Sequence, residues 1–164
     1  MRESDSVLFQ NITDFGFNLD DAWDEGINGI SISTLNTRDY PDMPKSIMNG
    51  VAVNIIYTKF REVNGIACGF IGGDFSETTN GLSLGVLFLS GERRNGITAA
   101  PGVVLIHQMN GISLGMINHC DTANGIQFGL FNSARTLYGI QIGILNHAEN
   151  SILPWFPFVN LVLN

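Results

Sequence analysis

A glycine followed by an aliphatic residue returns at a regular spacing along most of this chain, and that spacing restricts its fold more than any other feature. The glycine is preceded seven times by asparagine and once by tyrosine, at Gly29, Gly50, Gly65, Gly81, Gly96, Gly111, Gly125 and Gly139. The steps between them are 21, 15, 16, 15, 15, 14 and 14 residues. A fixed short period is typical of proteins in which each unit packs only on its neighbours. The sequence therefore predicts a stacked repeat architecture.

The residues after each asparagine alternate between apolar and small or polar, which predicts a strand with one buried face. The second position after the asparagine is always aliphatic: Ile30, Val51, Ile66, Leu82, Ile97, Ile112, Ile126 and Ile140. The third position is small or polar: Ser31, Ala52, Ala67, Ser83, Thr98, Ser113, Gln127 and Gln141. We expect the aliphatic row to form the core and the third position to face solvent.

Many repeats also carry a second glycine and a second asparagine. The glycines are Gly69, Gly85, Gly115, Gly129 and Gly143, and the asparagines are Asn36, Asn118, Asn132 and Asn146. Two adjacent apolar residues follow this glycine, so we expect a corner here, made by a positive φ or a close backbone approach. Stacked coils place like residues above like, so both asparagine rows should form hydrogen-bonded ladders.

These features favour an all-β fold, a parallel β-solenoid with coils of 14–16 residues. The alternative is an antiparallel β-meander or barrel, because Asn-Gly is also a preferred hairpin turn. We expect one domain with an N-terminal acidic cap over residues 1–27, an eight-repeat body over 28–151 and a C-terminal aromatic cap over 152–164. The aromatic side chains of that last segment should close the core of the final coil.

The charge distribution excludes some partners. The net charge is −7, and residues 1–42 carry all of it, with nine acids against Arg2 and Arg38, while residues 43–164 hold six charges of each sign. No basic patch is present in the sequence, so direct nucleic-acid binding is not expected. The longest apolar tract, 152–163, is too short and too interrupted by prolines to be a transmembrane segment. No leader begins the sequence, which predicts a cytoplasmic location for a complete chain and a surface or secreted one if a leader has been removed.

Two motifs resemble chemical sites. Residues 81–85 and 111–115 match the Gly-x-Ser-x-Gly nucleophile elbow, but equivalent repeats place Ala67 and Gln127 at the serine position. His119 and His147 occupy the same repeat position two coils apart, roughly 10 Å, too far to share one metal ion. The sequence therefore predicts no catalytic residue, no metal site and no cofactor.

Over residues 49–164 the repeat Gly-[Ile/Leu/Val]-x-[apolar]-Gly-x-x-Asn, with its closing Leu153-Pro154-Trp155-Phe156-Pro157-Phe158, resembles a family of bacterial surface-repeat proteins best known from leptospires. The clearest matches are residues 111–118, 125–132 and 139–146. The resemblance implies an exported or lipid-anchored protein, and it supplies no catalytic residues.

The leading functional hypothesis is a non-enzymatic scaffold that binds a protein partner, with caps that also allow homo-oligomers. The candidate contacts are the acidic segment and the aromatic end: Asp20, Asp21, Trp23, Asp24, Glu25, Trp155 and Phe156. One alternative is a cytoplasmic acidic inhibitor that mimics nucleic acid. Another is an enzyme with its site at a cap or at the loop around Tyr40.

Overall fold

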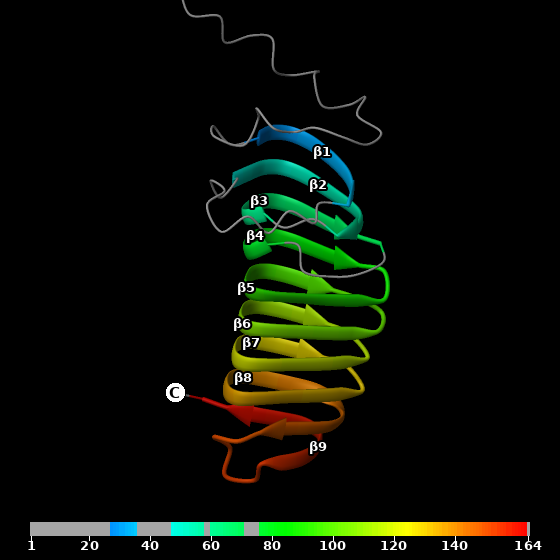
Figure 1. Cartoon of the computed structure of the whole chain (residues 1–164). Coiled ribbons are helices and arrows are strands. Elements are labelled where there is room, and N and C mark those ends of the chain that lie inside the picture. Colours follow the sequence, from blue (N-terminus) through cyan, green and yellow to red (C-terminus); the bar gives the residue numbers. More distant parts are fainter. Residues whose placement is uncertain (1–26, 36–46, 58–59, 71–75, 164) are drawn as a thin grey trace, which may run out of the picture.

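The computed structural model describes residues 27–35, 47–57, 60–70 and 76–163, and these residues form an all-β solenoid (Figure 1). The strands are β1 (Ile27–Leu35), β2 (Ile47–Tyr57), β3 (Phe60–Gly69), β4 (Ser76–Gly85), β5 (Phe88–Ala99), β6 (Val103–Leu114), β7 (Ile117–Phe128), β8 (Phe131–Ala148) and β9 (Trp155–Val162). None of the described residues belongs to a helix long and apolar enough to cross a bilayer.

The order of the strands in the sheet is their order in the chain. Every pairing from β1 to β8 is parallel, and the Asn-Gly pairs stay in register from Gly29 to Gly139. Only β9 runs antiparallel to its neighbour, β8. The predicted parallel solenoid is therefore confirmed, and the meander is wrong.

In β1 to β7 the Asn-Gly pair, and in β8 the pair Tyr138-Gly139, form one corner of the coil. The glycines there have φ between 126° and 145°, a region that residues with a side chain rarely adopt. A Cβ at Gly125 would also overlap the carbonyl oxygen of Gly111 in the preceding coil. The preceding asparagines form the predicted ladder, in which Asn110 Nδ2 donates to Asn95 Oδ1 at 2.7 Å and Asn124 Nδ2 donates to Asn110 Oδ1 at 2.8 Å.

The second glycine and the second asparagine form the opposite corner of the coil. At Gly129 a Cβ would overlap the carbonyl oxygen of Gly115, so this row uses close backbone approach, while positive φ belongs to the Asn-Gly row. The second asparagine row is a buried ladder. Asn118 Nδ2 donates to Asn132 Oδ1, and Asn132 Nδ2 donates to Asn146 Oδ1, both at 2.8 Å. The predicted second ladder is confirmed here, and Asn36 lies outside the described residues.

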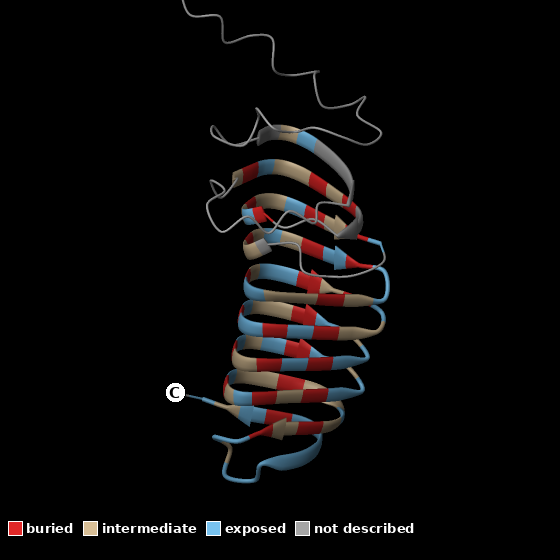
Figure 2. Ribbon diagram, viewed as in Figure 1, coloured by how far each residue is buried: buried red, intermediate tan, exposed pale blue. Residues whose placement is uncertain are grey.

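The predicted core row is wrong, because the two alternating rows face the opposite way. Buried residues alternate with exposed or half-buried ones along most of β3 to β8 (Figure 2), with the small or polar row inside and the aliphatic row outside. Thus Gln127 is fully buried, while Ile126 is 36% exposed. The aliphatic side chains are exposed at Ile30, Ile66, Ile97 and Ile126 and half-buried at Val51, Leu82, Ile112 and Ile140. The small or polar row is buried at Ala52, Ala67, Ser83, Thr98, Ser113, Gln127 and Gln141.

The physical reason is that alternation fixes only the period of a strand. A shift of one residue moves every side chain to the other face, and the closure of the coil decides which set is inside. The opposite run of the coil already fills the interior with Leu89, Val104, Ile106, Met109 and Leu137. The residues that face them across the narrow interior are therefore small, or are amides that hydrogen-bond along the stack.

One charged side chain also lies inside. Arg94 is 2% exposed, and its guanidinium donates to the carbonyl oxygens of Ser90 at 2.7 Å and Arg93 at 3.2 Å. A Cβ at Gly91 would overlap that guanidinium, so this glycine leaves the room that the arginine occupies.

At the C-terminal end, the aromatic side chains do not close the core as predicted. Trp155, Phe156 and Phe158 are all exposed. The buried residue at this end of the interior is instead Asn160 of β9. Its Nδ2 donates to Gln141 Oε1 at 3.3 Å. An amide suits this place because the interior row that it continues is itself made of amides.

Candidate binding site: an apolar groove along the solenoid

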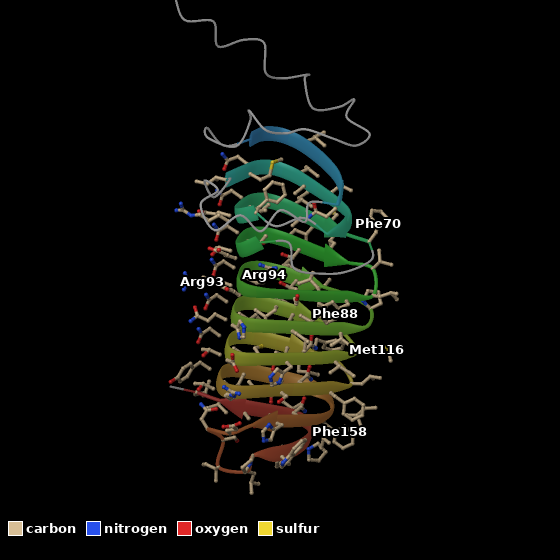
Figure 3. All side chains as sticks on the ribbon, viewed as in Figure 1. Phe70, Phe88, Arg93, Arg94, Met116 and Phe158 are labelled. Carbon is tan, nitrogen blue, oxygen red and sulfur yellow. The ribbon has the colours of Figure 1, made fainter. Side chains whose placement is uncertain are left out.

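The outside of the solenoid is amphipathic. We call the run from each Asn-Gly glycine to the opposite corner, such as Gly125–Leu130, the apolar flank, and the run that leads back, such as His119–Asn124, the polar flank. Outward residues of the apolar flank are almost all aliphatic or aromatic, whereas the polar flank presents His107, Asp121, Arg135 and the outer asparagine ladder. Figure 3 shows Met116 and Phe158 at one edge of the stack and Arg93 at the other.

A groove of about 810 Å³ runs along the apolar flank from β4 to β9. Its floor is the row Gly85, Ala100, Gly115, Gly129 and Gly143. One wall is the outward row Leu84, Ala99, Leu114, Phe128 and Ile142. The other wall is the corner row Pro101, Met116, Leu130 and Ile144.

The floor is bare backbone because the residues of this row point into the interior of the coil and away from the groove. A Cβ at Gly143 would overlap the carbonyl oxygen of Gly129, and one at Gly115 would come within 3.0–3.1 Å of Asn118, Val104 and Ala100. The backbone of the floor is held by hydrogen bonds between coils, such as Gly129 N to Ile142 O at 3.0 Å. The buried asparagines support it from inside, since Asn118 Nδ2 donates to Phe128 O at 3.0 Å. The floor of the groove is therefore hydrogen-bonded backbone.

Phe158 closes the C-terminal end of the groove. It pairs with Gly143, so a large aromatic side chain follows a row of glycines and one alanine. Its φ is 68°, and it is the only residue other than glycine with a positive φ in the described part of the chain. Such a conformation costs about 1–3 kcal/mol in a bulky residue and is enriched at functional sites. Its side chain is 72% exposed.

The polar flank holds an ion-paired cluster. His107 Nδ1 donates to Asp121 Oδ2 at 2.7 Å, and Arg135 lies 3.3 Å from the other carboxylate oxygen. The hydrogen bond from His107 lowers the pKa of Asp121, and the positive charge of Arg135 adds to that effect. The cluster is largely solvated, so it stabilises the fold little. In the described part of the chain, no three His, Cys, Asp or Glu residues are grouped to hold a metal ion.

The two thiols differ in their surroundings. Cys120 is buried beside Gln127, whose Nε2 lies 2.8 Å from the sulfur, and burial raises the pKa of Cys120 to about 12. Cys68 is partly exposed, and burial raises its pKa as well. A thiol needs its thiolate form to react, so Cys120 is a core residue and not a nucleophile.

The site residues predicted from the sequence lie apart from the groove or outside the described residues. Trp155 is exposed at the end of the stack, where its ring packs on His147 with centroids 4.3 Å apart, and Phe156 is its exposed neighbour. The acidic segment with Asp20, Asp21, Trp23, Asp24 and Glu25, and the loop around Tyr40, lie outside the described residues. Ser83 and Ser113 of the two elbow-like motifs are buried, and Ser113 Oγ donates to Asn118 Oδ1 at 2.7 Å.

The residues that line the groove were not predicted as a site. A signal for them was present, because the adjacent apolar residues Leu130 and Phe131 cannot both face a core in an extended strand. None of the lining residues is titratable. This arrangement can bind an apolar surface and offers no group for acid–base or nucleophilic chemistry.

Comparison with protein-family models, with curated proteins and with solved structures gave no match.

Proposed function

We propose that this protein is a non-enzymatic scaffold that binds a macromolecular partner through its apolar flank. The observation that carries the proposal is the continuous groove with a glycine floor, two apolar walls and no titratable lining. Binding by burial of apolar surface needs a surface of this kind, whereas catalysis needs convergent polar groups. Location at a bacterial surface belongs to the same proposal and rests on the repeat resemblance.

The size of the apolar surface supports a macromolecule as partner. The six strands that line the groove, β4 to β9, extend about 24 Å at ~4.8 Å spacing, and six residues at ~3.3 Å give a width of about 20 Å, so this surface covers roughly 480 Å². Apolar patches of about 300–600 Å² on soluble monomers are often functional. Solvent exposure of this surface is costly, and a partner that covers it removes that cost.

The test is capture of a partner from an extract of the source cells by immobilised protein. The apolar-flank variant replaces Leu114 and Phe128, both exposed, by Asp. The control is Leu105→Asp, because Leu105 is an exposed leucine of the polar flank. We expect the same captured species for wild type and control, identified by mass spectrometry, and their loss with the apolar-flank variant.

Capture of the same species by the double variant would contradict the proposal and would mean that the partner binds elsewhere on the protein. The acidic segment is then the first candidate, and replacement of its four acids by Asn and Gln would test it. Capture through that segment should weaken steeply with salt, since a Debye length of ~8–10 Å limits its range.

A further inference from the structure

We infer that the partner of the apolar flank is a second copy of this chain, so that the protein is a dimer with the two grooves facing each other. The inference rests on the proposed function, because it names the occupant of the same surface. Three observations lead to it: the repeat distance of the surface, the placement of ridge beside groove, and the lack of charge.

The repeat distance favours a copy over an unrelated partner. The corner row Met116, Leu130 and Ile144 projects one apolar side chain per coil, and the coils are in strict register from β6 to β8. These side chains therefore form a ridge with a period of ~4.8 Å. A second copy presents the same period along its whole length, so its side chains interdigitate at every coil. The side chains of a partner without this period would fit between the ridge residues at only one or two coils.

The placement of ridge and groove satisfies a two-fold interface. In such an interface the same patch serves both subunits, so it must be complementary to itself. The ridge of Met116, Leu130 and Ile144 lies directly beside the glycine floor of Gly115, Gly129 and Gly143. The ridge of each copy can then fill the groove of the other. At roughly 480 Å² for each copy, the surface that lines the groove gives about 960 Å² in total, close to the ~1,000 Å² that a specific interface needs.

The chemistry of the flank argues against a charged occupant. The groove walls contain Leu, Ala, Phe, Ile, Pro and Met and no Lys or Arg. Interfacial membrane binding is usually assisted by basic residues beside the apolar face, which these walls do not supply. A dimer needs no such residues.

Phe158 fits the same interface. Its strained backbone places an exposed ring at the end of the groove, in line with the floor of the preceding coils. In the dimer this ring packs against the last ridge residue that enters the groove. Trp155 lies outside the groove and stays at the end of the stack.

The experiment measures the molar mass of the purified full chain by sedimentation velocity and light scattering over a wide range of concentration. Leu130→Asp is the test variant and Leu105→Asp the matched control, because the two leucines are 39% and 37% exposed on opposite flanks. We expect dimers for wild type and for the control, and monomers for Leu130→Asp, with circular dichroism unchanged. Leu130→Asn, without a charge, is the second variant and should weaken the dimer at least tenfold if Leu130→Asp fails to fold.

Cross-linking then locates the interface. A photoreactive phenylalanine analogue at position 130, in a mixture of ¹⁴N- and ¹⁵N-labelled protein, should give mixed-isotope cross-links to the Phe128 and Ile142 rows. Mixed cross-links confined to β9 or to the polar flank would overturn the inference.

The remaining outcomes separate this inference from the proposed function. A monomeric wild type whose extract capture still depends on Leu114 and Phe128 would overturn the dimer and leave the scaffold intact. A monomeric wild type that floats with neutral phosphatidylcholine vesicles would also overturn the dimer and assign the flank to a membrane. If the wild type is monomeric and its capture of a partner does not change when Leu114 and Phe128 are replaced, both proposals are overturned.

Discussion

Gln141 Nε2 donates to Gln127 Oε1 at 2.7 Å in the interior of the solenoid, with both side chains fully buried. The contact belongs to a longer chain of interior hydrogen bonds, which continues from Gln127 to the sulfur of Cys120 and from Asn160 to Gln141. The amides of Gln127, Gln141 and Asn160 are thus linked along the stack. Loss of one partner leaves another polar group without its bond.

The first prediction follows from this chain. Gln127→Glu should lower the free energy of unfolding by about 3 kcal/mol or more at neutral pH, because a buried carboxylate replaces an amide that donates to Cys120. Ile126→Asp, on the outside of the same strand, should cost about 1–2 kcal/mol. Urea denaturation followed by circular dichroism measures both. A larger loss from Ile126→Asp would mean that the outer row is the core.

The second prediction compares the two asparagine ladders. Asn132→Ala removes the bonds of Nδ2 to Asn146 Oδ1 and Ile142 O and leaves Asn118 Nδ2 without one of its acceptors. We expect a loss of about 2 kcal/mol or more, because these groups are buried. Asn110→Ala in the exposed ladder is the control and should cost about 1 kcal/mol or less. Equal losses in urea denaturation would contradict the difference in burial.

The third prediction concerns the Asn-Gly corner. Gly125→Ala combines a φ of 134° with a Cβ that overlaps the backbone of Gly111. We expect a cost of about 3 kcal/mol or more, visible as a lower melting temperature, while Thr122→Ala in the same strand should cost about 1 kcal/mol or less. An alanine at 125 that melts like wild type would show that the corner can rearrange.

The fourth prediction uses the thiol of Cys120. The pKa of Cys120 is about 12 in the fold against an ordinary value of 9.0, so the unfolded chain loses its proton first as the pH rises. The stability that the neutral thiol contributes is complete below pH 9.0 and is lost as the pH rises toward about 12. Cys120→Ser keeps an acceptor for Gln127 without a titrating thiol, so the stability of this variant should fall less over this range.

The burial of Cys120 can also be tested by labelling. In the native wild type, a thiol reagent should label Cys68 first. Labelling of Cys120 at the same rate without unfolding would contradict its burial.

The fifth prediction separates strain from association at Phe158. Phe158→Gly relieves a positive φ, which returns about 1 kcal/mol, and removes a ring that is mostly solvent-exposed. The melting temperature of the monomer should stay level or rise, while the dimer should weaken. A clear drop in the melting temperature would show that the ring is needed to hold β9 on β8.

The sequence was sufficient to predict the class of the fold, and the reasons lie in particular residues. The Asn-Gly pairs predicted the parallel register, because a ladder of amides forms only when like residues stack. The sequence alone could not show whether Ile126 or Gln127 faces the interior, since the alternating pattern is the same in both cases. The groove could not be predicted for the same reason. Its wall with Phe128 belongs to the apolar side of the same alternation, and its floor is open only because Gly129 and its equivalents point inward.

The strict register of β1 to β8 also bears on how such a chain can change length. Each coil contacts only the coils beside it, so one unit of 14 or 15 residues can be gained or lost between β6 and β7 without altering either end. The antiparallel β9 cannot be copied in this way, because a further parallel coil does not continue from it. Duplication of an internal unit would therefore lengthen the groove by a fixed step of ~4.8 Å and keep Phe158 at its end. The length of the binding surface can change in whole coils while the closing residue stays the same.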